Sequence, residues 1–210
     1  MKTHCAFIRR NRLSDLFKLL KTGEIMKKET GFSMVEIWVV LGILGIIAVF
    51  AIPSYRYWMV TYRVNAAARN LFSDMQVARM RAISERCDYM ICFDTGNNGY
   101  AVYRDVSGNG LDAGDPCVKS VSIPQEYSGI GYGYVSATSP SGDPISSAVT
   151  FTGTPRRFSF QPTGLVNKWG SVYFKPMIEP YDDHKNLQRV ITVILTGRIR
   201  LYRHNGTGWE

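Results

Sequence analysis

The feature that most constrains this chain is an unbroken apolar run near its start. No charged or strongly polar side chain occurs from Ile37 to Ile52, and the 24 residues from Phe32 to Tyr55 contain a single charge, Glu36. A helix rises about 1.5 Å per residue, so this stretch exceeds the roughly 20 residues that cross the hydrocarbon core of a bilayer. The sequence therefore predicts one transmembrane helix.

Charge on either side of the run predicts its orientation. The whole chain has a net charge of +8. Residues 1–31 contain eight Lys or Arg against three acidic residues, a net of +5, which leaves +3 for the rest. The next basic residue after the apolar run is Arg56. By the positive-inside rule, residues 1–31 stay in the cytoplasm and everything after the helix is exported.

A cleaved secretory signal peptide is the main alternative for a basic start followed by an apolar run. The apolar region is too long for one, no small-x-small cleavage site follows it, and the helical pattern continues past Pro53. Glu36 also lies inside the run, where a charge costs roughly 2.5–3.5 kcal/mol at the membrane centre and less near an end. We therefore expect a retained anchor in which Glu36 has a partner.

The segment Lys27–Glu36, K-K-E-T-G-F-S-M-V-E, resembles the class III signal of type IV prepilins and pseudopilins. The resemblance implies that a prepilin peptidase cuts between Gly31 and Phe32 and N-methylates Phe32. It further implies that Glu36 neutralises the Phe32 amine of a neighbouring subunit within lipid. The alternative is that Glu36 only reaches toward the headgroups.

The 31-residue leader is longer than is usual for this class. A start at Met26 would give the short leader MKKETG, so we assign no function to residues 1–25. Trp38 is bulkier than the aliphatic residues expected at its place, and nothing in the sequence accounts for it. The expected organisation is a leader at 1–31 or 26–31, a membrane and assembly helix at 32–55, an amphipathic helix at 56–86, and a β-rich exported domain at 87–210.

Beyond Pro53 an amphipathic pattern continues the helix. Apolar residues spaced three and four apart form one stripe, while charged residues occupy the other faces. The stripe comprises Val60, Val64, Ala67, Leu71, Met75, Ala78 and Ala82. We expect a kink at Pro53, because proline removes one helical hydrogen bond and clashes with the preceding turn.

After Arg86 the sequence changes to short β-like runs separated by Gly, Asn, Asp and Pro. The turn residues predict antiparallel hairpins across 95–99 and 196–197, and residues 128–147 are expected to form a long loop. The predicted class is α+β, with the long helix packed on an antiparallel sheet. The predicted strands are 89–94, 100–105, 118–123, 149–152, 157–161, 171–174, 189–195 and 199–203.

Three motifs make the exported part resemble the GspH/FimT family of pilin-like proteins. They are Ala78–Ile83 (A-R-M-R-A-I) near the helix end, Phe158–Gly164 (F-S-F-Q-P-T-G), and Thr196–Arg200 (T-G-R-I-R) near the C-terminus. The resemblance covers Gly31 to the C-terminus loosely. It is stronger at the N-terminal signal than in the domain.

The cysteine and acidic residues suggest one disulfide and no metal site. Cys92 in a strand and Cys117 after a loop suggest a disulfide, with Cys87 free, while the alternative is three small buried thiols. No His or Cys grouping has metal-ligand spacing. The segment Asp105–Asp115 resembles a calcium loop, but its twelfth position is Pro116 instead of glutamate, so we expect a polar turn. We predict no metal and no cofactor.

The G-R-x-R element suggests a DNA contact. In a strand, Arg198 and Arg200 lie on one face about 6.7 Å apart while Ile199 and Leu201 point to the core, and Arg203 lies close by. Two guanidinium groups so spaced can contact separate phosphates. In FimT-like minor pilins such an element is associated with DNA capture. The alternative is an ordinary solvated strand face.

No catalytic motif occurs in the sequence, since a nucleophile elbow, a P-loop and HExxH are all absent. We therefore predict a non-enzymatic inner-membrane subunit of a type II secretion pseudopilus or type IV pilus. Its expected partners are prepilin peptidase, other pilin or pseudopilin subunits and membrane lipid. The alternatives are a DNA-binding minor pilin for DNA uptake and a membrane-anchored periplasmic binding protein that never assembles.

Overall fold

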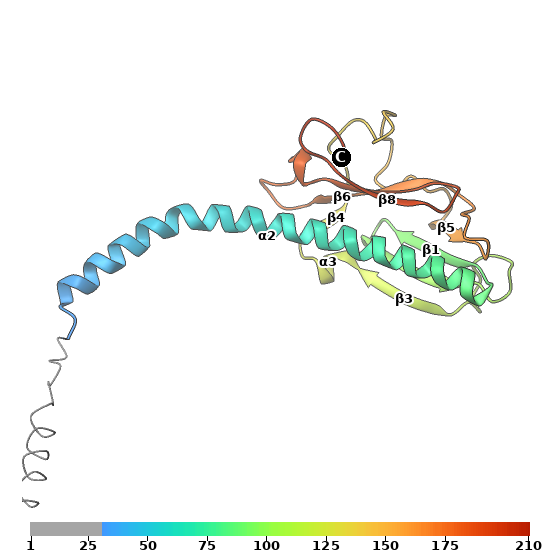
Figure 1. Cartoon of the computed structure of the whole chain (residues 1–210), viewed down its shortest axis with the longest axis horizontal. Helices are drawn as coiled ribbons and strands as arrows, with labels where there is room; N and C mark the ends of the chain where they lie inside the picture. The colour runs from blue at the N-terminus through green and yellow to red at the C-terminus, as the bar shows by residue number, and fades with distance from the viewer. Residues whose placement is uncertain (1–30) are drawn as a thin grey trace, which may run out of the picture. The chain divides into compact units, whose positions relative to one another are not determined.

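The structure is a computed structural model that describes residues 31–210 (Figure 1). The expectations for the leader, including a start at Met26, therefore lie outside the described residues. The chain divides into two compact units that meet between Val49 and Phe50, so that the second unit comprises Phe50–Glu210.

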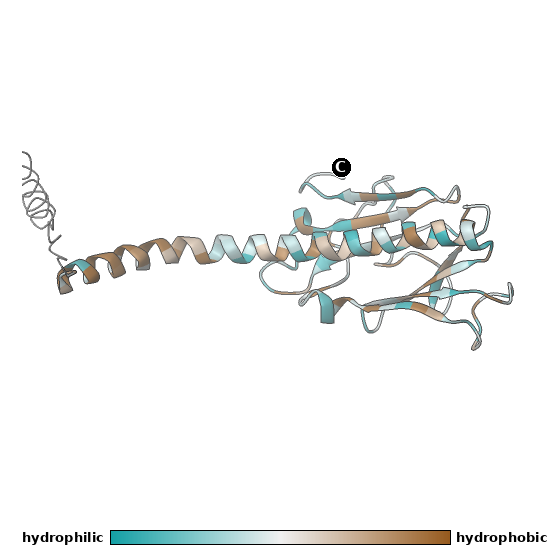
Figure 2. Ribbon diagram, turned by 60° about the horizontal axis from the view of Figure 1, so that its bottom comes forward, coloured by the Kyte–Doolittle hydropathy of each residue, from teal (hydrophilic) through white to brown (hydrophobic). Residues whose placement is uncertain are grey.

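The first unit contains Gly31–Ser33 and the start of helix α2, which runs from Met34 to Glu85. The helix begins where the backbone N–H groups of Glu36 and Ile37 donate to the carbonyl of Ser33, at 3.0 and 3.2 Å. All side chains from residue 31 to 49 are exposed, and Figure 2 colours most of this part of α2 as hydrophobic. The apolar side chains of this part of the helix are therefore not packed against any other described part of the chain.

Within the second unit α2 remains helical on both sides of Pro53. The kink expected at Pro53 stays a prediction. The predicted apolar stripe is confirmed, because all seven of its residues are buried, and Ala68 joins them. Four of the eight buried residues are alanines, and their small side chains let the sheets approach the helix closely.

Sheet A is antiparallel, with strand order β3-β2-β1-β5. Its inward side chains include Ile91, which pairs with Val102 on one side and Phe158 on the other. Tyr100 also points to the helix, and its hydroxyl donates to the Asp74 carboxylate at 2.6 Å. Burial and this hydrogen bond raise the pKa of Tyr100. The strands are β1 (Tyr89–Asp94), β2 (Gly99–Arg104), β3 (Cys117–Ser122) and β5 (Arg156–Phe160).

Sheet B is also antiparallel, with order β4-β6-β7-β8. Its strands are β4 (Ile130–Tyr132), β6 (Gly170–Pro176), β7 (Arg189–Val193) and β8 (Ile199–Arg203), and the short helices are α3 (Ile123–Glu126) and η1 (Lys185–Leu187). In Figures 1 and 2, the part of α2 that belongs to the second unit runs along the seam between the two sheets. Buried residues of α2, of sheet A and of sheet B share one hydrophobic core. The predicted α+β class is therefore confirmed, with two sheets where one was expected.

Two predicted elements differ from the structure. The apolar run 149–152 is not a strand, although Val149 forms one isolated bridge with Val172. Conversely, β4 lies inside the predicted long loop 128–147. Its Gly131 is needed at this place, because a Cβ there would lie 2.9 Å from the Asn98 side-chain oxygen. That oxygen accepts the Tyr132 N–H at 2.7 Å, so a distant asparagine helps to fix β4.

Candidate functional site

The predicted processing site lies at the beginning of α2. Gly31 and Phe32 precede the helix in non-regular backbone, and the Phe32 side chain is 78% exposed. Glu36 is the acidic residue of the first helical turn, where the partial positive charge of the helix N-terminus stabilises a carboxylate. The structure thus presents an accessible Gly–Phe bond, followed one turn later by an exposed acidic residue.

The helix that follows has the length and composition to cross a membrane. Helix α2 contains an apolar window of 18 residues in which no residue is buried. Just beyond it, Tyr55, Trp58 and Tyr62 project from one exposed face. The Trp58 and Tyr62 rings stack with centroids 6.0 Å apart. Tyr and Trp at the end of an apolar helix are typical of the membrane–water interface.

The G-R-x-R element lies at the free edge of sheet B. Arg198 and Arg200 are exposed, whereas Ile199 and Leu201 are partly buried and pack against the core. The predicted alternation is therefore present in the structure. The Arg200 guanidinium donates to the Tyr202 hydroxyl at 3.0 Å, which keeps it on the outer face.

Arg203 does not join Arg198 and Arg200. It pairs with Arg189 across β7 and β8, and Arg189 faces α2, where its Nε donates to Asn65 Oδ1 at 2.6 Å. Arg189 is 2% exposed, and one of its Nη atoms has no hydrogen-bond partner among the described residues. Burial lowers the pKa of Arg189 to about 10, and Arg203 and Arg69 add to this lowering. Strand alternation thus separates Arg203 from the other two arginines.

A groove of about 600 Å³ lies on the outer face of sheet B. We define this outer face by the residues Trp169, Ser171, Tyr173, Thr192, Ile194, Arg198 and Arg200. Five of them, from Trp169 to Ile194, line the groove. The inward neighbours Val172, Ile191 and Val193 belong to the core. Sequence reasoning missed this groove, although the alternation of Ser171 and Tyr173 with Val172 and Phe174 was a usable signal.

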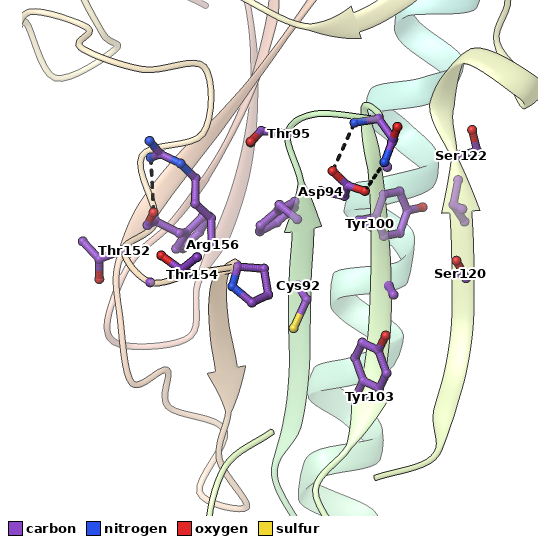
Figure 3. A pocket seen from close by; sticks show the side chains of 18 residues that line it. Cys92, Asp94, Thr95, Tyr100, Tyr103, Ser120, Ser122, Thr152, Thr154 and Arg156 are labelled. Carbon is purple, nitrogen blue, oxygen red and sulfur yellow. Dashed lines mark hydrogen bonds between the residues drawn. The ribbon is translucent and has the colours of Figure 1, made fainter. Parts of the chain in front are cut away.

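A second groove, of about 970 Å³, lies on the outer side of sheet A (Figure 3). Serine and threonine hydroxyls, Tyr103 and the Cys92 thiol are among the groups that line it. Its two charged side chains bond within the chain. Asp94 accepts from Asn97 at 2.7 Å, and Arg156 donates to the carbonyl oxygens of Val149 and Phe151. Among residues 31–210, the groove therefore offers polar surface without a free charged group to act on a ligand.

The structure differs from the predicted Cys92–Cys117 disulfide, because Cys87, Cys92 and Cys117 are all free thiols. Cys92 pairs with Ala101, while Cys117 pairs with Tyr103, so strand β2 lies between the two cysteines. Two strand spacings amount to about 9.5 Å, more than the Cα separation that a disulfide tolerates. Burial raises the pKa of Cys92 to about 11, which keeps its thiol protonated.

The Asp105–Asp115 segment forms a polar turn whose carboxylates accept hydrogen bonds from backbone N–H groups of the same segment. Asp105 accepts the N–H groups of Gly108 and Gly110 at 2.6 and 2.9 Å. Asp115 accepts those of Val106 and Asp112 at 3.1 and 2.9 Å. Within residues 31–210, no group of three or more His, Cys, Asp or Glu side chains is arranged to hold a metal ion. The carboxylates here therefore stabilise the turn.

Comparison with known proteins gives a family and a set of similar folds. The sequence model of the family described as "Type II transport protein GspH" matches residues 67–197, more than half of the chain. A search of curated proteins found no match. Among solved structures, the type IV minor pilin FimU of Pseudomonas aeruginosa is 16% identical, with a TM-score of 0.42 over 65% of this chain and 90% of that one. The minor pseudopilin EpsH of the Vibrio cholerae type 2 secretion system is 15% identical, with a TM-score of 0.46 over 67% of this chain and 97% of that one.

Proposed function

Because this chain belongs to the family of the type II transport protein GspH, we propose that it is a minor pilin or pseudopilin subunit, assembled into a type II secretion pseudopilus or a type IV pilus. The observation that carries the proposal is the exposed apolar part of α2, which begins three residues after Gly31 and contains Glu36 in its first turn. Such a helix needs either lipid or other helices around it. A subunit of this class has lipid before assembly and neighbouring subunits afterwards.

Processing is the first step of the proposed function. A prepilin peptidase cleaves between Gly31 and Phe32 and N-methylates Phe32. The exposed, non-helical backbone of these two residues supports this step, because a peptidase needs an accessible and unpaired scissile bond. Cleavage removes residues 1–31 and exposes a cationic amine at Phe32.

Assembly is the second step. Before it, the subunit is a single-pass inner-membrane protein with its leader in the cytoplasm and the residues after the membrane helix in the periplasm. Glu36 then neutralises the Phe32 amine of a neighbouring subunit within lipid, where either charge alone is costly. Its position in the first turn of α2, four residues from Phe32, supports such a contact between staggered helices. The subunit has a structural role and no catalytic one.

Co-expression of the full chain with a prepilin peptidase tests this function. The expected product begins at Phe32 and carries one added methyl group, as read by intact-mass spectrometry. Gly31→Ala should leave the chain uncut. Gly42→Ala is the matched control, since Gly42 also lies in an open position on the apolar segment, and this variant should be processed normally. An uncut wild-type chain would contradict the proposal and favour a signal-anchored binding protein that never assembles.

A second candidate function is DNA binding by a minor pilin, for DNA uptake. Arg200 on the edge strand β8 and Arg198 just before this strand are both exposed, and this observation favours DNA binding. Their expected role is to contact backbone phosphates, which would make binding insensitive to sequence and steeply dependent on salt. Arg203 is left out of this proposal, because it lies on the opposite face beside Arg189.

A further inference from the structure

We propose that the outer face of sheet B is a binding site for single-stranded nucleic acid, in which Arg198 and Arg200 hold phosphates and Trp169 stacks on a base. This inference rests on the DNA-binding role proposed above. It adds a second group of ligand contacts, a groove that receives bases, and a preference for unpaired strands.

The strand register brings these residues together from three separate segments. Ser171 pairs with Thr192, and Thr192 pairs with Arg200, so these three form one row across β6, β7 and β8. The second row lies just outside the strands, where Trp169 precedes β6, Ile194 follows β7 and Arg198 precedes β8. The Ile194 N–H donates to the Arg198 carbonyl at 3.2 Å, which continues the pairing into this second row. Each row therefore runs from the groove to a basic residue at the sheet edge.

Trp169 has the exposure that a stacking platform requires. Its side chain is 69% exposed although it lines the groove, and Ile194 beside it is 40% exposed. Two adjacent apolar side chains left open beside a groove are a sign of a binding surface. The flat indole can stack on any base, since every base has an aromatic face.

The polar groups around Trp169 suit a nucleotide. The hydroxyls of Ser171 and Thr192 lie 3.0 Å apart on the floor of the groove, where either can also bond a base or sugar. Lys168 lines the groove as well, with its Nζ donating to the Thr152 carbonyl at 3.1 Å. Asp143 is the one acidic residue that lines it within residues 31–210. With Arg198 and Arg200 at the edge, cations outnumber carboxylates, and the net charge favours an anionic ligand.

The distance across the sheet explains the preference for a single strand. Trp169 directly precedes β6 and Arg198 directly precedes β8, and these two strands are two strand spacings apart, about 9.5 Å. A strand with a phosphate at Arg198 can turn an unpaired base inward to Trp169. In a duplex the same base is paired and stacked, and turning it out requires additional free energy. A duplex can therefore use the arginines but not the tryptophan.

The test uses the full chain in lipid nanodiscs and a fluorescein-labelled 12-nucleotide thymidine strand, compared with the same strand in a duplex. Binding is measured by fluorescence anisotropy over a range of salt. We expect the single strand to bind about tenfold more tightly than the duplex. Trp169→Ala should weaken single-strand binding by about tenfold, the scale of one lost base stack, and leave duplex binding unchanged.

Arg198→Gln combined with Arg200→Gln should weaken binding to both DNAs. It should also reduce the salt slope for the single strand by about 1.4, the value for two phosphate contacts. Matched controls are Trp58→Ala and Arg81→Gln, which remove an exposed tryptophan and an exposed arginine from α2. Both controls should bind like the wild type. Thermal melting of every variant verifies that the domain is folded.

The outcomes separate the two proposals. If the arginine pair matters and Trp169→Ala changes nothing, the DNA-binding role stands and the stacking groove is overturned. If neither DNA binds at low salt, both are overturned. If polyglutamate binds as tightly as the oligonucleotide and also depends on Trp169, the groove is a peptide site and this inference is wrong.

Discussion

Gly197 approaches Gly164 so closely that a Cβ on Gly197 would lie 2.0 Å from the Gly164 carbonyl oxygen. Both glycines have positive φ, +76° and +78°. The same oxygen accepts the Nε–H of Arg79 on α2 at 3.1 Å, and Arg79 also reaches the carbonyl of Thr196 at 3.5 Å. The three sequence motifs of the domain therefore meet at one place, and the arginine strand starts from it.

Gly197→Ala should destabilise the domain and disturb the strand that carries Arg198 and Arg200. The substitution meets two obstacles, a positive φ that alanine rarely adopts and a backbone oxygen that cannot move without shifting the 161–165 turn. We expect a loss of roughly 2–4 kcal/mol in unfolding free energy, measured by denaturant titration of the full chain.

The matched control is Gly206→Ala. Gly206 also has a positive φ, +103°, but a Cβ there would meet no atom within 4 Å. It should therefore lose only the conformational part, about 1–2 kcal/mol. Equal losses in the two variants would show that the contact with Gly164 contributes nothing.

Glu36→Leu should separate membrane insertion from assembly. Insertion should be unchanged or improved, because a charge is removed from an apolar helix. Incorporation into filaments should be lost, because the Phe32 amine of the neighbouring subunit then has no counter-charge in lipid. Fractionation of membranes and sheared filaments measures the two steps independently. Leu41→Ile, an apolar exchange on the same segment, serves as the control, and normal incorporation of the leucine variant at position 36 would contradict the pairing.

The cysteines should differ in reactivity. Thiolate is the reactive form, and burial raises the pKa of Cys92 to about 11. Cys92 should therefore resist iodoacetamide at pH 7.5 and react faster as the pH rises toward 11, whereas the exposed Cys117 should be alkylated first. Peptide mapping by mass spectrometry gives the order. A Cys92–Cys117 peptide joined by a disulfide in protein purified without reductant would instead restore the bridge predicted from the sequence.

Regular periodicity made most of the fold predictable. The apolar stripe of α2 and the strands β1 and β8 have the predicted positions, and most other strands shift by one or two residues. Both patterns arise from local alternation between core and solvent. Strand β4 was missed because its three residues, Ile130–Tyr132, include a glycine and show no alternation. Its position depends on pairing with β6 and on the hydrogen bond from Tyr132 to Asn98, 34 residues away, and such distant contacts are not visible in local sequence.

The candidate site was less predictable than the fold. Alternation placed Arg198 and Arg200 correctly, but proximity in sequence wrongly grouped Arg203 with them. Trp169 was missed because its relation to Arg198 depends on the register of three strands. The disulfide prediction failed for a similar reason, since only the order β3-β2-β1 shows that a strand separates Cys92 from Cys117.

The strand order also determines when the fold can be completed. Strand β5 is paired with β1, but 61 residues separate the end of β1 at Asp94 from the start of β5. The stripe of α2 packs in a core that includes Ile191 and Val193 near the end of the chain. During synthesis, this core therefore stays incomplete until β7 has emerged. Helix α2 is therefore synthesised before the strands that pack on it. The core of the domain is completed only after β7 has emerged.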